Sequence, residues 1–146
     1  MVEQDYQVVH KIEAVHLGTH SQQKRAKKFD SKVFEGLRDT VHLVRGCKVM
    51  LTRNVNYAKG LANGTRGKVV GFVYGPGGLG TFPEAIVVDF PDYDGELHGK
   101  FYDDEPTWVP ILPMTSMKEG TRLTRTQFPL AAAFALTVNK AQGLTL

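Results

Sequence analysis

Turn-forming residues divide this sequence into short segments, and that division constrains its fold more than any other feature. Eight of the 15 glycines lie between Gly60 and Gly80. Gly and Pro interrupt regular structure, so the apolar stretches between them are long enough only for short strands. The pair Asn63-Gly64 is among the strongest hairpin signals, because both residues tolerate positive φ. This punctuation predicts an all-β centre that resembles a tightly turned small barrel.

The apolar segments between the turns predict the individual elements. Residues 20–29 are polar and basic, which predicts a short helix or an exposed loop, and the Gly- and Pro-rich residues 75–83 predict a mobile loop. In the expected strand over 84–90, Ile86, Val88 and Phe90 alternate and should point inward. The ranges expected to form strands are 8–15, 41–44, 47–52, 68–74, 84–90, 97–102, 108–112 and 123–128.

Composition excludes several classes of protein. The 146 residues are 42% hydrophobic and 23% charged, which is typical of one globular domain. The single cysteine, Cys47, excludes an internal disulfide framework and a zinc site of several thiolates, and its apolar neighbours predict a buried, unreactive thiol. The longest apolar run, residues 130–138, is too short to span a bilayer, and the acidic opening lacks the features of a signal peptide. We therefore expect a soluble intracellular chain.

Charge is distributed unevenly along the chain. Residues 1–68 carry 13 Lys and Arg against 6 acids, whereas residues 69–146 carry 5 against 9. Residues 84–105 contain eight of those acids and only Lys100 as a cation. Basic surfaces attract nucleic-acid backbones and acidic surfaces repel them. The basic run QQKRAKK (22–28) is equally compatible with a solvated surface.

Common catalytic and metal-binding patterns fail in this chain. A phosphate-binding loop ending at Lys68 would need Gly at position 62 and Ser or Thr at position 69, where Ala62 and Val69 stand. The helical spacing of His16 and His20 lacks a third ligand, so surface histidines are the expected interpretation. We predict no metal site and no catalytic residue within the chain.

Polar residues follow a long apolar segment near the end of the sequence. Pro129 is followed by LAAAFALTV, then by NKAQG, and then by three residues that resume the apolar pattern. The side chains of this polar segment suit phosphate and sugar oxygens, and a glycine permits close approach of the backbone. The residues concerned are Thr137, Asn139, Lys140, Gln142 and Gly143. The pattern alone also fits a polar cap on the end of a strand.

Two separated segments resemble one known family. They are GCKVMLTRNVNYAKGLANGTRGKVVGF (46–72) and RTQFPLAAAFALTVNKAQGLTL (125–146). Both resemble superfamily 1 DNA helicases of the petite-integration-frequency and RecD-like branch. The shorter pieces IEAVHLG, FDSKVFEGL and WVPI stand in the expected order, so the resemblance extends from about Val8.

The resemblance implies an α/β fold with a large β component. Residues 1–59 would begin a second RecA-like helicase domain, residues 60–108 would form an inserted small Src-homology-type β-barrel with adjoining strands, and residues 109–146 would return to the RecA-like domain. The chain would then be a fragment of an ATP-dependent 5′–3′ DNA helicase, an ATP hydrolase. Such enzymes act in DNA repair, recombination and telomere maintenance.

The resemblance also assigns roles to individual residues. It implies contacts with single-stranded DNA by Thr137, Asn139, Lys140 and Gln142, and a nucleotide-facing position for Gly143. The family usually has histidine where this chain has Asn139, and asparagine cannot become cationic. The remaining matched positions are read as a structural turn entering the barrel; they are Asn63, Gly64 and Gly67.

A full-length parent would use ATP and Mg²⁺ and would work in the nucleus or mitochondrion if it were eukaryotic. Its partners would be single-stranded DNA and the first RecA-like domain of the same polypeptide. The chain itself carries no phosphate-binding loop, so we expect it not to hydrolyse ATP or unwind DNA alone. Two alternatives remain at this point: a non-catalytic small-barrel module that binds nucleic acid, and a degenerate relic of a mobile-element helicase.

Overall fold

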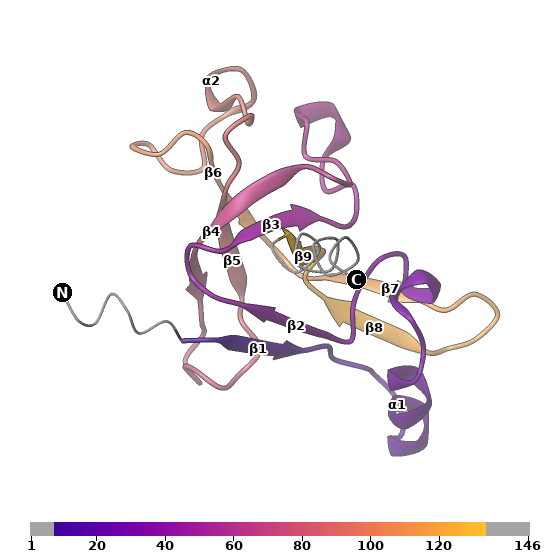
Figure 1. The fold of residues 1–146 in the computed structure, drawn as a ribbon. Coiled ribbons are helices and arrows are strands. Elements are labelled where there is room, and N and C mark those ends of the chain that lie inside the picture. Colours follow the sequence, from indigo (N-terminus) through magenta and orange to yellow (C-terminus); the bar gives the residue numbers. More distant parts are fainter. Residues whose placement is uncertain (1–7, 134–146) are drawn as a thin grey trace, which may run out of the picture.

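Short strands dominate the architecture of this protein (Figure 1). The computed structural model describes residues 8–133. The helices are α1 (His20–Lys27) and α2 (Gly95–His98), with 3₁₀ helices η2 (Ser31–Phe34) and η3 (Tyr57–Lys59). The strands are β1 (His10–Glu13), β2 (Thr40–Leu43), β3 (Lys48–Leu51), β4 (Arg66–Val73), β5 (Ala85–Asp89), β6 (Trp108–Ile111), β7 (Met114–Met117), β8 (Thr124–Gln127) and β9 (Leu130–Ala132).

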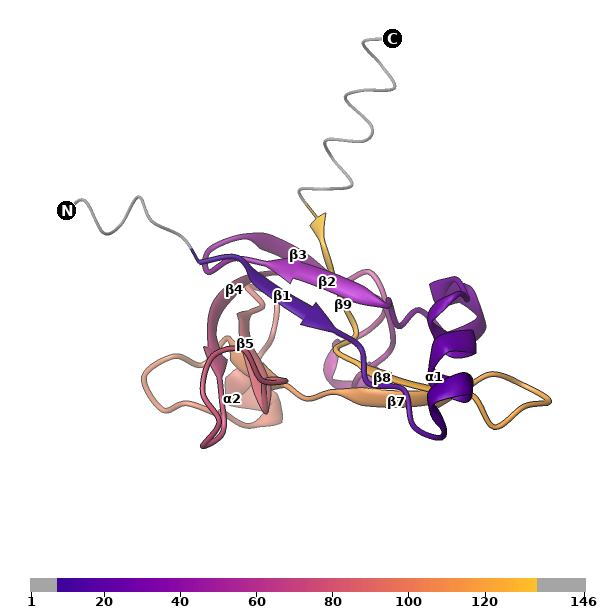
Figure 2. The same cartoon turned by 90° about the horizontal axis from the view of Figure 1, so that it is seen from below.

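The strands form one large sheet and two small ribbons. The large sheet has five strands in the order β6-β5-β4-β3-β9, and the ribbons pair β1 with β2 and β7 with β8. Every pair between these strands is antiparallel. The large sheet takes strands from all three of the segments 1–59, 60–108 and 109–146. Two views place α1 and α2 at opposite ends of the molecule (Figures 1 and 2).

Most of the strands expected from the sequence are confirmed. Seven of the eight predicted ranges contain a strand, and residues 20–29 contain α1. The Gly- and Pro-rich residues 75–83 form a loop without helix or strand. Strand β7 was not predicted, because its sequence MTSM carries little apolar alternation. The short strands therefore follow directly from the turn punctuation.

The predicted strand over 97–102 is wrong, because helix α2 and a loop occupy this range. The Asp94 side chain accepts a hydrogen bond from the Leu97 backbone N–H at 3.0 Å, which caps the first turn of α2. The Gly99 backbone, with φ of 103°, then ends the helical turn. These local capping contacts outweigh the apolar pattern of the segment.

The connection from β3 to β4 is longer than the two-residue hairpin that Asn63-Gly64 indicated. Residues 52–65 join the two strands, and the pair lies within this loop. Gly64 has φ of 96°, whereas Asn63 does not adopt positive φ. The Gly64 N–H donates to the Leu51 carbonyl at 2.8 Å, and the Asn63 N–H donates to Asn54 Oδ1 at 2.8 Å. The turn signal is thus used to close a larger loop.

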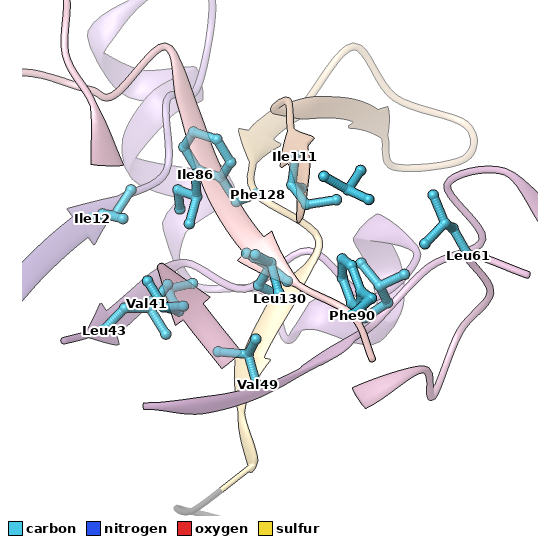
Figure 3. Close-up of a cluster of buried hydrophobic side chains, with 14 of the residues drawn as sticks. Ile12, Val41, Leu43, Val49, Leu61, Ile86, Phe90, Ile111, Phe128 and Leu130 are labelled. Carbon is cyan, nitrogen blue, oxygen red and sulfur yellow. The ribbon is translucent and has the colours of Figure 1, made fainter. Parts of the chain in front are cut away.

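The main core lies between the large sheet and the β1–β2 ribbon (Figure 3). Ile86, Val88 and Phe90 are fully buried in it, as their alternation predicted. The opposite face of β5 is also covered, because Ala85 and Val87 are buried too. Strand β5 is therefore covered on both faces, and it holds the centre of the fold.

A second, smaller core lies beneath α1. Thr19 and Gln22 form a capping box at the start of the helix, in which each side chain pairs with the other residue's backbone N–H. Ala26 of the helix packs with residues of η2, β7 and their neighbours. This cluster comprises Ala26, Phe34, Leu37 and Leu123, with Phe29, Val33 and Met114 at its edge.

Arg125 of β8 connects this second core to the rest of the molecule. Its side chain is fully buried, and its guanidinium donates to the carbonyls of Ala26, Phe29 and Leu37 at 2.9–3.1 Å. Its Nε–H donates to Nε2 of His16 at 3.0 Å. His16 is buried, so the expectation of a surface histidine is wrong at this position, because the Arg125 donor satisfies its ring nitrogen inside the fold. A buried cation is tolerated when its donors are satisfied, so Arg125 joins α1 and η2 to the β7–β8 ribbon.

The expectations about metal binding, membrane spans and Cys47 can be compared with the described part of the chain. Among residues 8–133, no group of three or more His, Cys, Asp or Glu side chains could hold a metal ion. In the same range no helix is long and apolar enough to cross a membrane. Cys47 is half-buried rather than fully buried, and this burial raises the pKa of its thiol. A raised pKa lowers the fraction of reactive thiolate.

Candidate nucleic-acid interface

The residues predicted to contact DNA and nucleotide lie outside the described residues. They are Thr137, Asn139, Lys140, Gln142 and Gly143. The three residues predicted as a structural turn are placed: Asn63 and Gly64 lie in the loop 52–65, whereas Gly67 lies within β4. Among the described residues, the candidate interface consists of β3, β4 and the loop 52–65 that joins them.

Gly67 occupies a position that leaves no room for a side chain. A Cβ atom at Gly67 would lie 2.7 Å from the Asp89 carbonyl oxygen and 2.7 Å from Val88 Cγ1. Its partner across the pair with β3 is buried Val49, so this face of the hairpin points into the core. Because side chains alternate along a strand, the neighbours Arg66 and Lys68 point the opposite way, to solvent.

The outward face of the β3–β4 hairpin carries three cations. Lys48 of β3 lies directly opposite Lys68 of β4, and Arg66 lies opposite Met50. All three cations are exposed, whereas Val49 and Val69 on the other face are buried. We call Lys48, Arg66 and Lys68 the basic strip. Arg66 and Lys68 are two apart on β4, a spacing of about 7 Å, whereas Lys48 and Lys68 are direct cross-strand neighbours about 5 Å apart, so positive charge is concentrated on the outer face of the hairpin.

Among the described residues the cations of the basic strip form no ion pair, although Asp89 of β5 lies directly across from Lys68. Among residues 8–133, the ion pairs involve Lys27, Arg53 and Lys100, together with His16, and none involves Lys48, Arg66 or Lys68. No side-chain hydrogen bond occupies them in that range either. An exposed cation without a partner keeps its full attraction for external anions. The strip is thus available to a phosphate backbone.

The sequence segment that carries the strip contains no acids, and the sequence-based prediction missed this signal. Residues 40–83 contain six Lys and Arg and no Asp or Glu. These cations are Arg45, Lys48, Arg53, Lys59, Arg66 and Lys68. Net charge counted over residues 1–68 and 69–146 divides this acid-free stretch between two segments that both contain acids. Net charge counted over a window as long as one hairpin reveals it.

The loop 52–65 has a defined internal structure. Asn56 and Leu61 exchange two backbone hydrogen bonds of 2.9 and 3.0 Å. The Thr65 hydroxyl accepts from the Ala62 N–H and donates to the Gly60 carbonyl, both at 3.1 Å. Leu61 is buried and reaches the main core close to Phe90 (Figure 3). These contacts anchor the loop, whose tip is η3, on the end of the sheet.

An acidic segment leaves the same end of the sheet. Residues 90–107 connect β5 to β6 and contain six acids and one cation, Lys100, which pairs with Glu96 at 3.0 Å. Asp89 and Trp108, at the two ends of this segment, lie in line with Lys68 of the strip. We call residues 90–107 the acidic excursion. Its acids are Asp92, Asp94, Glu96, Asp103, Asp104 and Glu105.

The hairpin coincides with a segment that matches a known family. Residues 37–72 match the family model of the 2B domain of DNA helicase Pif1. This range contains β2, β3, the loop 52–65 and most of β4. A second line of evidence is whole-sequence similarity: the chain is 37% identical over 101 residues to the ATP-dependent DNA helicase PIF1 of Danio rerio, covering 69% of this chain and 13% of that protein.

The resemblance to Pif1-type DNA helicases is confirmed. The chain is also 32% identical over 106 residues to the human ATP-dependent DNA helicase PIF1, covering 73% of this chain. It spans 12–14% of the length of the curated relatives that it matches. The similarity therefore concerns one segment of much longer proteins.

The fold is shared with solved Pif1 structures. In a structure of Pif1 helicases described for unwinding of forked double-stranded DNA, the similarity covers 87% of this chain and 23% of that chain, with a TM-score of 0.55 and 19% identity. A Pif1 helicase from Bacteroides in complex with ADP-AlF3 and single-stranded DNA gives a TM-score of 0.50 and 19% identity, over 90% of this chain and 26% of that chain. The sheet-rich architecture is thus that of a segment of a Pif1 helicase.

Proposed function

We propose that this chain is part of an ATP-dependent DNA helicase and that it holds single-stranded DNA along the basic strip. The observation that carries the proposal is the position of the strip: Lys48, Arg66 and Lys68 lie within the segment that matches the Pif1 2B domain. They are exposed and have no ion pair within the described residues. Exposed cations grouped on the outer face of two neighbouring strands suit a phosphate backbone.

The proposal includes the finer features that the resemblance implies. We propose that the segment belongs to a second RecA-like domain with an inserted Src-homology-type barrel, and that the parent moves 5′ to 3′ using ATP and Mg²⁺. Thr137, Asn139, Lys140 and Gln142 would add DNA contacts, while Gly143 would face the nucleotide. One face of the ATP cleft would come from this segment, and the other from the first RecA-like domain.

The chain alone is proposed to bind DNA without hydrolysing ATP. Phosphoryl transfer needs groups that cradle the phosphates and neutralise charge, and this sequence lacks a phosphate-binding loop. In the parent, the roles of its relatives in DNA repair, recombination and telomere maintenance would apply, in the nucleus or mitochondrion of a eukaryote. An ATPase activity of the purified chain that is stimulated by single-stranded DNA would contradict this part of the proposal.

Binding to labelled oligo(dT) at several salt concentrations tests the proposal. For single strands, each phosphate contact contributes about 0.7 to the slope of log affinity against log salt, so three strip contacts and one contact from Lys140 predict a slope of about −3. Replacing Lys140 by Ala should reduce the magnitude of the slope by about 0.7, to about 2. A chain that does not bind, or whose binding is independent of salt, would contradict the proposed function.

A second candidate is a non-catalytic nucleic-acid-binding module, or a helicase relic that retains only binding. The observation that favours it is that the strip and its sheet lie entirely within residues 8–133 and need no contribution from residues 136–146. The Lys140→Ala variant separates the two candidates. Unchanged affinity would favour the module, whereas weaker binding to single-stranded DNA would favour the helicase segment.

A further inference from the structure

Tyr57 is an aromatic side chain displayed at the tip of the loop 52–65. It begins η3, and its side chain is 73% exposed. Within the part of the chain that the structure describes, its hydroxyl makes no hydrogen bond and its ring makes no contact with another ring. Large aromatic residues generally bury their surface and satisfy their polar atoms. Tyr57 therefore presents most of its surface to solvent.

The other tyrosines of residues 8–133 are engaged by the fold. The Tyr74 hydroxyl lies 2.7 Å from Nδ1 of His10, and the Tyr93 hydroxyl donates to the Gly99 carbonyl at 2.8 Å. Tyr102 packs edge-on against Trp108, with ring centroids 6.0 Å apart. Each of these rings has a structural use in the monomer. Tyr57 has none, which distinguishes it from the rest.

The backbone that carries Tyr57 is held in place. The Gly60 N–H donates to the Tyr57 carbonyl at 3.0 Å, and the paired backbones of Asn56 and Leu61 close the tip. Leu61 is 2% exposed and ties the loop to the main core. A ring on an ordered support needs less additional ordering when it binds a ligand, which favours affinity.

The surroundings of Tyr57 determine which ligand fits. The loop continues directly into Arg66, the strip residue nearest the tip, and Lys59 follows Tyr57 by two residues. No Asp or Glu occurs in residues 40–83, so neither the loop nor the hairpin contributes a negative charge of its own; Glu35 is paired with Arg53 at 3.1 Å. Cations that follow a backbone, next to an exposed aromatic ring, form the combination that binds single-stranded nucleic acid.

We propose that Tyr57 stacks on a base of single-stranded DNA whose phosphates lie on the basic strip. This inference rests on the proposed function, because it requires DNA on Lys48, Arg66 and Lys68. A duplex keeps its bases stacked on one another, so the ring contact is specific for single strands. Since every base has a π-face, the contact does not select a sequence.

Affinity for oligo(dT) measured with the 146-residue chain and single variants tests this inference. Tyr57→Ala should weaken binding about 5- to 100-fold, the range that loss of one stacked base produces, while Tyr57→Phe should bind as the unchanged chain does. The slope against salt should stay the same in Tyr57→Ala, because no phosphate contact is removed. Leu79→Ala is the matched control, since Leu79 is 68% exposed in the loop 75–83, away from the strip.

A second measurement replaces the bases of the oligonucleotide instead of the tyrosine. An abasic strand of equal length keeps the phosphates but offers no ring, so the unchanged chain and Tyr57→Ala should bind it equally. Equal affinity of both proteins for oligo(dT) would overturn the role of Tyr57 while leaving the proposed function standing. Failure of the unchanged chain to bind oligo(dT) would overturn both. A urea midpoint within error of the unchanged chain shows that each variant is folded.

Discussion

The loop 52–65 and the acidic excursion leave the same end of the large sheet and differ in almost every other respect (Figure 1). The loop and its hairpin lie in an acid-free stretch, whereas the excursion carries six acids and one lysine. The loop displays Tyr57, while the excursion packs its Tyr93 and Tyr102 against other rings. One segment is suited to bind a polyanion and the other to repel it.

The contrast between the two segments places surfaces of opposite charge side by side on one small sheet. Lys68 and Asp89 are neighbours across β4 and β5, so the sign of the surface changes between adjacent strands. A nucleic-acid backbone bound along the strip, as proposed, would be repelled on the β5 side and held over β3 and β4. Arg125 shows a third use of charge: it is buried, and its donors serve the fold rather than a partner.

The largest expected effect comes from Arg125, and it separates cations that fold the chain from cations that bind. Arg125→Met should lower the free energy of unfolding by about 3 kcal/mol or more, since it removes the guanidinium donors to the Leu37 and Phe29 carbonyls and to His16, and one of the donors to the Ala26 carbonyl. Urea unfolding measures this change. The matched control is Arg122→Met, because Arg122 is exposed on the turn before β8; its effect should stay within about 0.5 kcal/mol. Similar stability of the two variants would contradict the role of Arg125.

Neutralising the basic strip and the acidic excursion separately tests which of the two surfaces binds DNA. Changing Lys48, Arg66 and Lys68 together to Gln should weaken binding of oligo(dT) about 100-fold at 0.1 M salt, because three phosphate contacts are lost. Changing Asp92, Asp94 and Glu96 to their amides should leave the affinity unchanged or raise it. Fluorescence anisotropy with a labelled oligonucleotide measures both. Equal losses in the two triple variants would show that the strip is not the binding surface.

Two glycines of β4 test how closely its hairpin must pack on β5. Gly67→Ala should lower the free energy of unfolding by about 1 to 3 kcal/mol, since its Cβ would lie 2.7 Å from the Asp89 carbonyl oxygen. Gly71→Ala is the control on the same strand, because no atom lies within 4 Å of its Cβ position. It should be neutral or stabilising, since Ala loses less backbone freedom than Gly. An unchanged free energy of unfolding in Gly67→Ala would mean that β4 and β5 can move apart enough to admit a methyl group.

The smallest expected effect is a pH dependence of stability from His16. Burial and the nearby Arg125 and Lys27 hold the pKa of His16 below the ordinary value of 6.5, although Asp39 opposes this. The unfolded chain therefore binds a proton more readily, so stability is fully present above about pH 6.5 and falls as pH decreases below it. Urea unfolding between pH 7.5 and 5 measures the slope.

A His16→Gln variant should show a shallower dependence on pH, because one of the groups that titrates differently in the two states is removed. Some slope should remain, since burial also lowers the pKa of His10. An unchanged slope in His16→Gln would exclude His16 as its source. Binding to oligo(dT) at pH 7.5, where His16→Gln remains folded, should not depend on His16, because His16 is buried against Arg125 and is not part of the strip.

Much of the fold could be predicted from local sequence. Gly and Pro spacing predicts short strands, and alternation in β5 predicts the inward positions of Ile86, Val88 and Phe90. The errors have a physical cause. The strand expected over 97–102 fails because the Asp94 cap and Gly99 favour a helical turn. Arg125 could not be predicted as buried, because the carbonyls that satisfy it come from residues 88 to 99 positions earlier in the chain.

Most of the short strands, the sign of charge along the chain and the resemblance to Pif1-type helicases could be read from the sequence, whereas residues 20–29 were compatible with either a helix or a loop. These properties depend on neighbouring residues, whose preferences are local. Tertiary structure alone decided that Lys48 and Lys68 lie side by side, that their face is the outward one, and that the acidic excursion leaves the sheet beside them. Pairing register and burial join residues distant in sequence, because a sheet is held by hydrogen bonds and packing between strands rather than within them.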